Sequence, residues 1–117
     1  MVEFRFEWDK KKENRNVKKH GVSFSDARSV FYDENAIQYY DPDHSDREDR
    51  FILLGLSFKL QTLVVCHCFR EGETVIRIIS ARKADKDEER EYWNQRKWET
   101  TTTFQKWKAA KILLLNI

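Results

Sequence analysis

The chain opens with alternating apolar and polar residues and then changes to helical spacing. In residues 3–8 an aromatic residue stands at every second position, which is typical of a half-buried strand. Asp9 can cap a helix over residues 10–19, and Gly21 can end that helix in the left-handed conformation. This helix carries few apolar residues, so we expect it to lie on the surface.

A second helix is predicted to begin at Ser23, because Asp26 stands three residues further on, in a near relative of the capping box. It should stop near Asp33. Its core-facing stripe consists of Phe24, Ala27, Val30 and Phe31.

Four more strands and a helix complete the pattern. The strands are predicted over Ala36–Tyr40, Arg50–Leu56, Leu63–Phe69 and Val75–Ala81. Residues 63–69 are apolar on both faces, so we expect the central strand there. Asp85 and Glu88 predict a capped helix over residues 86–98. The order β-α-α-β-β-β-β-α favours an α+β fold with a small, mostly antiparallel sheet packed with helices.

Length and charge narrow the class of protein. With 117 residues, 36% charged and 40% hydrophobic, the chain reads as one folded domain. No apolar run approaches the roughly 18 residues that span a bilayer, and no signal peptide is evident, so we expect a cytoplasmic protein without membrane contact. The net charge of +2 identifies no partner by itself. Residues 10–20 are strongly basic, however, and mark either a phosphate-binding face or, more commonly, a solvated helix.

The two cysteines flank a histidine in an apolar strand. Cys66 and Cys68 stand two positions apart, about 6.5–7 Å on a strand, which is too far for an unstrained disulfide. His67 points to the opposite face, and no second cysteine pair exists to complete a zinc site. We therefore expect these residues to pack in the core, and we predict no metal and no cofactor.

Arginine and lysine residues are the stronger candidates for chemistry. Arg77, Arg82 and Lys83 lie in or just after the last predicted strand, and Arg50 starts a neighbouring one. On an ideal strand Arg77 and Arg82 face opposite sides, so either the strand ends by Ala81 or one of these arginines is structural. The bidentate geometry of the guanidinium group favours Arg82 as the main phosphate ligand, supported by Arg50, Arg77 and Lys83.

The histidines leave their roles open. His20 follows a helix, where it suits the helix dipole, and in second place it is a candidate acid or base. His44 lies among the turn-forming residues Asp41, Pro42 and Ser45, so we interpret it as a turn residue. No serine can be assigned to a histidine, so a catalytic triad is not predicted.

Cleavage of RNA is a reaction that such a set of cations can promote. The ribose 2′-OH attacks its own phosphate, and positioned cations stabilise the phosphorane that forms. Aromatic rings such as Trp8 and Tyr92 can stack a single-stranded base. The candidates for RNA contacts are Trp8, Lys10, Lys11, Arg15, Lys19 and Tyr92.

Short polar motifs stand at the ends of the predicted elements. They are Phe6-Glu7-Trp8-Asp9, Lys19-His20-Gly21-Val22-Ser23-Phe24, Asp41-Pro42-Asp43-His44-Ser45 and Arg77-Ile78-Ile79-Ser80-Ala81-Arg82-Lys83-Ala84, with Glu48, Arg50, Glu89 and Tyr92. Their order and spacing resemble the BrnT-type toxins of bacterial type II toxin–antitoxin systems, over about residues 4–95. That family is related to the RelE-like ribonucleases.

The resemblance implies a ribonuclease that arrests translation. Because the sequence offers no metal-ligand set with plausible geometry, we expect this endoribonuclease to cut RNA without a metal, by 2′-OH transesterification. The resemblance also implies a cognate BrnA-type antitoxin that neutralises the toxin and represses the shared operon, so that DNA is contacted only through the antitoxin. The alternative is a non-catalytic antitoxin-binding module that acts in transcriptional autoregulation.

The C-terminal segment lies outside the family pattern. We assign residues 1–98 to a RelE-like toxin domain and residues 99–117 to a helical extension. An apolar stripe is formed by Phe104, Trp107, Ala110, Leu114 and Ile117. We expect this helix to pack on a second copy, giving a homodimer, or on the antitoxin, while folding back onto its own sheet is the alternative.

Overall fold

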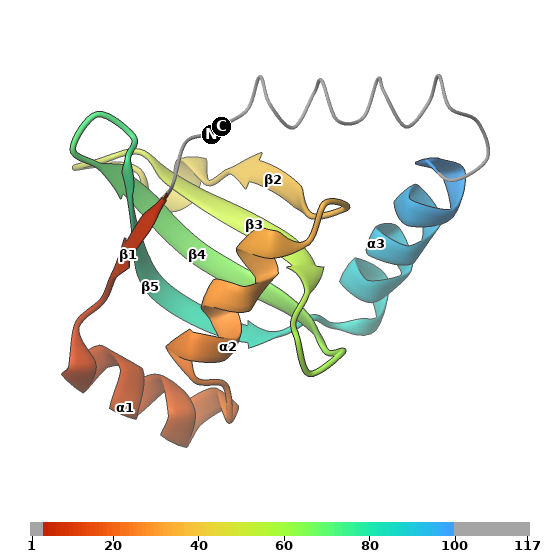
Figure 1. Cartoon of the computed structure of the whole chain (residues 1–117), viewed down its shortest axis with the longest axis horizontal. Coiled ribbons are helices and arrows are strands. Elements are labelled where there is room, and N and C mark those ends of the chain that lie inside the picture. The colour runs from red at the N-terminus through yellow and green to blue at the C-terminus, as the bar shows by residue number, and fades with distance from the viewer. Residues whose placement is uncertain (1–3, 100–117) are drawn as a thin grey trace.

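The computed structural model describes residues 4–99, which form a five-stranded sheet with one helix across its front (Figure 1). The elements are β1 (Arg5–Glu7), α1 (Lys10–His20), α2 (Phe24–Ser29), the 3-10 turn η1 (Val30–Tyr32), β2 (Ile37–Tyr40), the 3-10 turn η2 (Pro42–His44), β3 (Arg50–Leu56), β4 (Thr62–Arg70), β5 (Val75–Lys83) and α3 (Lys86–Glu99). This order confirms the predicted α+β fold. The predicted helix over residues 104–117 lies outside the described residues. Within residues 4–99 no helix is long and apolar enough to cross a membrane.

The strands are arranged in the order β1-β5-β4-β3-β2, so β4 is central, as its two apolar faces predicted. Strands β2 and β3, β3 and β4, and β4 and β5 form antiparallel pairs. Only the short β1 runs parallel to its neighbour β5, over the three residue pairs from Arg5 to Glu7. The sheet is therefore mostly antiparallel, as expected.

The predicted caps fix where the helices begin and end. The side chain of Asp9 accepts hydrogen bonds from the backbone N–H groups of Lys11 and Lys12, and Gly21 ends α1 with φ of 69°. Ser23 caps α2 by accepting the N–H of Asp26. These local interactions set the short connection that returns the chain from α1 to the sheet.

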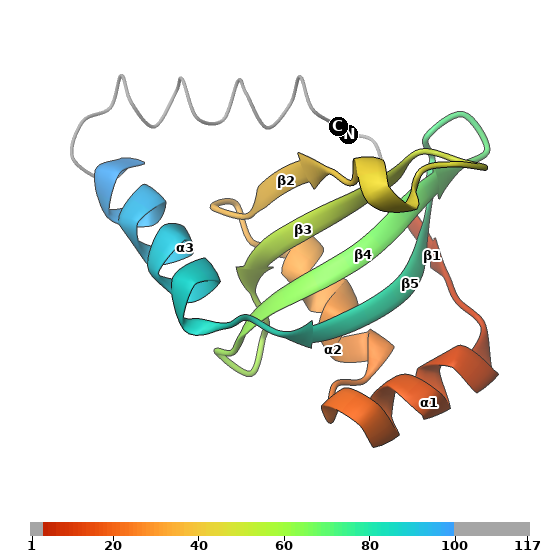
Figure 2. The same cartoon turned by 180° about the vertical axis from the view of Figure 1, so that it is seen from behind.

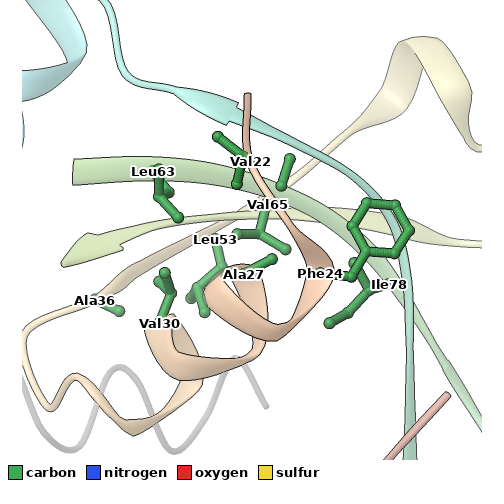
Figure 3. Packing of buried hydrophobic residues seen from close by; sticks show 10 residues of the cluster. Val22, Phe24, Ala27, Val30, Ala36, Leu53, Leu63, Val65 and Ile78 are labelled. Atoms are coloured by element: carbon green, nitrogen blue, oxygen red, sulfur yellow. The ribbon is translucent and has the colours of Figure 1, made fainter. Parts of the chain in front are cut away.

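The main core lies between α2 and one face of the sheet, which we call the first face (Figure 3). Phe24, Ala27 and Val30 of the helical segment are fully buried against this face. Gly55 in β3 permits the close approach, because a Cβ there would lie 2.8 Å from side-chain carbons of both Val30 and Ala36. The buried set is Val22, Phe24, Ala27, Val30, Ala36, Leu53, Leu63, Val65, Ile78 and Ala81.

The other side of the sheet, the second face, is only partly covered. The buried ring of Tyr92 on α3 packs there with Leu54 and Val64. Figure 2 shows this face from behind, with β3, β4 and β5 open between α3, α1 and the turn that follows β2. Helix α2 thus covers the first face, whereas α3 covers only part of the second face and leaves the rest accessible.

A β-bulge in β5 corrects one prediction from the strand pattern. Cys66 of β4 pairs with Ser80, but the next residue, His67, pairs with Ile78, so Ile79 is the extra residue. The strand does not end by Ala81 but continues to Lys83.

The extra residue reverses the alternation of side chains beyond it. Arg77 pairs with Cys68 and Arg82 pairs with Val64, and these two β4 residues share one face. Both arginines therefore lie on the second face, although an unbroken strand would have placed them on opposite faces. Arg50, which pairs with Cys68 from the other side, shares that face too.

The cysteines are free thiols, and His67 lies on the opposite face of the sheet from them, as the strand pattern predicted. The imidazole is fully buried among the rings of Phe31, Phe51 and Phe69. Its Nδ1 lies 3.1 Å from the carbonyl oxygen of Val65, to which it can donate. Burial lowers the pKa of His67 to about 4.

This burial predicts an acid-sensitive core. Because the folded-state pKa of His67 lies below its ordinary value of 6.5, the unfolded chain takes up the proton first. We expect the free energy of unfolding to fall by up to about 3 kcal/mol as pH drops from about 6.5 to about 4. Urea unfolding at several pH values checks this, with His67→Phe as the comparison. An equally steep loss in His67→Phe would contradict the assignment.

Candidate active site on the second face of the sheet

A hollow of about 290 Å³, which we call the central hollow, lies on the open part of the second face. Its floor comes from alternate residues of β3 and β4 and from four consecutive residues of β5, and its rim from the end of α1 and the segment after β2. The lining residues are His20, Asp41, His44, Arg50, Ile52, Val64, Cys66, Ile79, Ser80, Ala81 and Arg82. The hollow thus gathers three of the predicted catalytic residues, His20, Arg50 and Arg82.

Two smaller hollows extend the central one in opposite directions. The helix-side hollow, of about 210 Å³, shares His20, Ile79 and Ser80 with it and adds Lys12, Arg15, Asn16 and Lys19. The turn-side hollow shares His44 and Arg50 and adds Asp43, Asp46, Arg47 and Glu48. Because lining residues are shared, the three form one tract from α1 across β5 to η2, with basic groups along its α1 end.

Arg82 is the best-anchored cation of the tract. Its guanidinium donates to both carboxylate oxygens of Glu88 at 2.7 and 2.9 Å, in a bidentate ion pair with the first turn of α3. These hydrogen bonds raise the pKa of Arg82 and lower the pKa of Glu88. Glu88 also accepts the N–H of Asp85 as the predicted capping box. The Arg82 side chain remains 43% exposed, so part of the guanidinium still faces solvent.

Arg50 carries a polar atom whose hydrogen bonding is incomplete. Its Nε is buried and has no hydrogen-bond partner among the described residues. A guanidinium nitrogen lies 3.8 Å from Glu48, which is beyond hydrogen-bonding distance. Arg50 therefore stands at the junction of the central and turn-side hollows, with an Nε that has no hydrogen-bond partner among the described residues and a long ion pair to Glu48.

Arg77 lies outside the hollows, in a ladder of ion pairs along the second face. It is 3.7 Å from Glu7 of β1, and Arg70 bridges Glu7 at 3.6 Å and Glu48 at 3.1 Å. Glu48 in turn approaches Arg50. The alternating charges connect Arg77 to Arg50 across the sheet, so the protein itself supplies a carboxylate partner for Arg77.

His44 and Asp41 form a pair at the rim of the central hollow. Nδ1 of His44 lies 2.9 Å from Oδ2 of Asp41, whose side chain is only 10% exposed. Ser45 anchors the same turn, because its hydroxyl donates to the carbonyl of Asp41 and accepts the N–H of Arg50. The N–H of Asp41 also donates to the carbonyl of Arg50. His44 is thus part of a turn, as predicted, and this turn is fastened to the start of β3.

Asn16 positions His20, at the end of α1, beside the central hollow. Its carboxamide donates to the carbonyls of Val22 and Ala81, each at 2.8 Å, and accepts the N–H of Ala81 at 3.1 Å. β1 pairs with β5 only as far as Arg77, so the Asn16 side chain takes the place of a neighbouring strand beside Ala81. This contact holds the end of α1, where His20 lies, against the part of β5 that carries Ser80 and Arg82.

The remaining predicted site residues lie in different surroundings. Trp8 is half-buried and packs edge-on against Phe24, with ring centroids 6.2 Å apart. Tyr92 is fully buried and donates to Asp33, so its ring presents no face to solvent. Lys83 is exposed and by register lies on the face opposite Arg82.

On α1, the predicted RNA-contact residues divide into two groups. Arg15 and Lys19 line the helix-side hollow. Lys10 instead bonds the buried carboxylate of Glu13 at 2.9 Å, and this bond lowers the pKa of Glu13. Lys11 is exposed on the helix surface. The structure therefore brings the second half of the basic helix, rather than its beginning, to the tract.

Sequence reasoning missed three polar residues that build the site: Asn16, Asp41 and Glu88. The Asp-to-His spacing of three residues around Pro42 was an available signal for the Asp41–His44 pair, since this spacing brings side chains together in a helical turn. For Glu88 the capping pattern was recognised but its bond to Arg82 depends on tertiary structure. Among residues 4–99 no three His, Cys, Asp or Glu side chains gather into a group that could hold a metal ion.

The fold and the tract define a small α+β protein with an open site that is basic at its α1 end and contains two further arginines, Arg50 and Arg82, in its central hollow. Residues 8–88 match the model of the family described as "Ribonuclease toxin, BrnT, of type II toxin-antitoxin system", and the chain belongs to this family. The resemblance to the BrnT-type toxins that the sequence motifs predicted is thereby confirmed. The chain is a ribonuclease toxin of the type II toxin–antitoxin class, whose members act with an antitoxin partner.

A solved structure supports the fold. The chain is similar to the 1.1 Å crystal structure of the Brucella abortus ribonuclease toxin, BrnT, with a TM-score of 0.52 and 24% sequence identity. The similarity covers 71% of this chain and 99% of that one. No curated protein sequence matches this chain significantly.

Asn16 provides a test of how the site is assembled. We expect Asn16→Ala to lower the free energy of unfolding by about 2–3 kcal/mol, because it leaves buried backbone groups of Ala81 and Val22 unsatisfied. Urea denaturation of the two proteins measures the difference. Asn14→Ala, at an exposed position of the same helix, is the matched control and should change stability by less than about 0.5 kcal/mol. Equal effects of the two substitutions would contradict the structural role of Asn16.

Proposed function

We propose that this toxin cuts single-stranded RNA in the central hollow by 2′-OH transesterification, without a metal ion, and that it inhibits translation in the cytoplasm. The observation that carries the proposal is the convergence of Arg50, Arg82 and His20 on one open hollow. The family supplies the ribonuclease class, and the arrangement of side chains supports the choice of chemistry.

Stabilisation of charge is the main task of the site. Attack of the 2′-oxygen on phosphorus gives a phosphorane with two negative charges, and preorganised cations stabilise it most effectively. Arg50 is suited to this role because its Nε lacks a hydrogen-bond partner among the described residues and its contact with Glu48 is long, at 3.8 Å. Arg82 can add a second guanidinium when the phosphate shares or replaces its bonds to Glu88.

The RNA strand is proposed to follow the tract beyond the scissile phosphate. Lys12, Arg15 and Lys19 line the helix-side hollow, where they can contact neighbouring phosphates. Lys10, Lys11, Lys83 and Arg77 would then affect binding through longer-range attraction. Such contacts carry little base specificity, because phosphate groups are common to every sequence.

The antitoxin is proposed to be a BrnA-type protein whose DNA-binding part contacts the shared operon, so that the toxin reaches DNA only through its partner. Residues 104–117 lie outside the described residues. Their docking on a second copy or on the antitoxin, and the boundary between residues 98 and 99, stay predictions.

Arg82 is the first residue to test. We expect Arg82→Ala to lower the rate of RNA cleavage by about 10²–10³, because a donor to the developing charge is lost. The assay follows labelled single-stranded RNA, and circular dichroism verifies the fold. Arg90→Ala is the control, since Arg90 forms an exposed ion pair with Asp87 on the same helix that carries Glu88. Undiminished cleavage by Arg82→Ala would remove Arg82 from the site.

Metal independence has a separate test. Since Arg50 and Arg82 are assigned the charge stabilisation, RNA cleavage should continue at the same rate in excess EDTA, and the products should carry 2′,3′-cyclic phosphate and 5′-hydroxyl ends. Loss of cleavage in EDTA that a single divalent ion restores would show that a metal takes part. A 5′-phosphate end would exclude attack by the 2′-OH.

A further inference from the structure

We propose that His44, oriented by Asp41, is the general base that takes the proton from the ribose 2′-OH. This inference rests on the proposed transesterification and adds a catalytic residue to it. It assigns to His20, on the opposite rim of the same hollow, the role of the general acid. The two imidazoles come from segments far apart in the sequence, the end of α1 and η2, and both line the central hollow.

The hydrogen bond to Asp41 determines which nitrogen of His44 can act as a base. Nδ1 lies 2.9 Å from the carboxylate, which can only accept when ionised, so Nδ1 carries the proton. The neutral imidazole then has its lone pair on Nε2, which has no protein partner among the described residues. A carboxylate that fixes a histidine tautomer in this way also stabilises the imidazolium formed after proton transfer.

The pair is not needed to hold the turn together. The η2 segment is already fastened to β3 by backbone bonds between Asp41 and Arg50 and by the hydroxyl of Ser45. The turn also has no need of a nearly buried carboxylate. The side chain of Asp41 is only 10% exposed, and burial of a charge is unfavourable unless a partner compensates for it. The imidazole of His44 is that partner, and its own side chain is 66% exposed.

Two arginines line the same hollow as this ring and can hold a phosphate there. They are Arg50 and Arg82, and His20 and the thiol of Cys66 line the hollow as well. On the turn side the bordering charges are Asp43, Asp46, Arg47 and Glu48. A phosphate held by Arg50 and Arg82 would therefore lie between the two histidines, with the basic groups nearest to its oxygens.

The proposed step balances without a further reactant. The 2′-oxygen forms a bond to phosphorus as its proton passes to Nε2 of His44. The bond from phosphorus to the 5′-oxygen breaks, and that oxygen receives a proton from protonated His20. The products are a 2′,3′-cyclic phosphate and a 5′-hydroxyl end, and exchange of protons with water restores both histidines.

The test uses the purified full chain and a labelled mixed-sequence single-stranded RNA. His44→Gln keeps a donor for Asp41 but removes the base, so we expect kcat to fall by about 10²–10⁴ while KM changes by less than about threefold. The acid limb of the pH profile of kcat/KM, which reports the base in the free enzyme, should also disappear. Added imidazole should restore part of the rate of His44→Ala, an effect that a purely structural role does not give.

Two more variants separate orientation from local charge. Asp41→Asn should lower kcat at least tenfold, because an amide can also hold the wrong imidazole tautomer. Asp49→Asn removes the same charge from the segment between η2 and β3, at an exposed position outside the three hollows, and should leave the rate within about twofold.

The outcomes distinguish this inference from the function beneath it. If the wild-type protein cuts RNA to cyclic phosphate ends but His44→Gln is equally active, or imidazole has no effect on an inactive, folded His44→Ala, the base is not His44. If the wild-type protein leaves RNA uncut or gives other ends, the proposed transesterification itself fails, and the role of His44 fails with it.

Discussion

One extra residue in β5, Ile79, determines which side chains the second face presents. A regular strand alternates its side chains, so Arg77 and Arg82 would lie on opposite faces, and Arg82 would point into the core beneath α2. The bulge restores Ala81 to the core and turns Ser80 and Arg82 outward to the hollow. The same strand thus presents apolar residues to the first face from Ile76 to Ala81 and polar residues to the second face beside α1. Bulges next to active sites commonly redirect side chains in this way.

Buried polar groups complete the assembly around that strand. Asn16 replaces the missing neighbour of β5, and Asp41 fixes the turn that carries His44. Each burial is unfavourable unless every bond is made, so each permits few alternative arrangements. The rims of the hollow are positioned by hydrogen bonds with defined geometry, while the scaffold behind them is held by apolar packing that tolerates small shifts.

The sequence predicted the elements of this fold because the signals for them are local. Asp9, Gly21 and Ser23 act within one turn of the chain, and the apolar residues on both faces of β4 indicate a central strand by themselves. The candidate site was predictable only in part. Arg50, Arg82 and His20 could be chosen by residue type and by position at element ends. The bulge at Ile79 and the bond from Arg82 to Glu88 depend on pairing between distant segments, which no local pattern contains. For the same reason Trp8 and Tyr92 could be identified as large aromatic rings, but not as rings that pack inward.

The ion pair between Arg82 and Glu88 ties the hollow to α3. A phosphate that engages this guanidinium competes with a carboxylate in the first turn of the helix, so the two contacts are thermodynamically coupled. Thermodynamic linkage makes this coupling reciprocal. A phosphate bound to Arg82 weakens the contact between Arg82 and the start of α3, and any interaction that strengthens this contact lowers the affinity of Arg82 for a phosphate. The Glu88 carboxylate therefore competes with any anion for the guanidinium of Arg82, at an effective concentration that the fold determines.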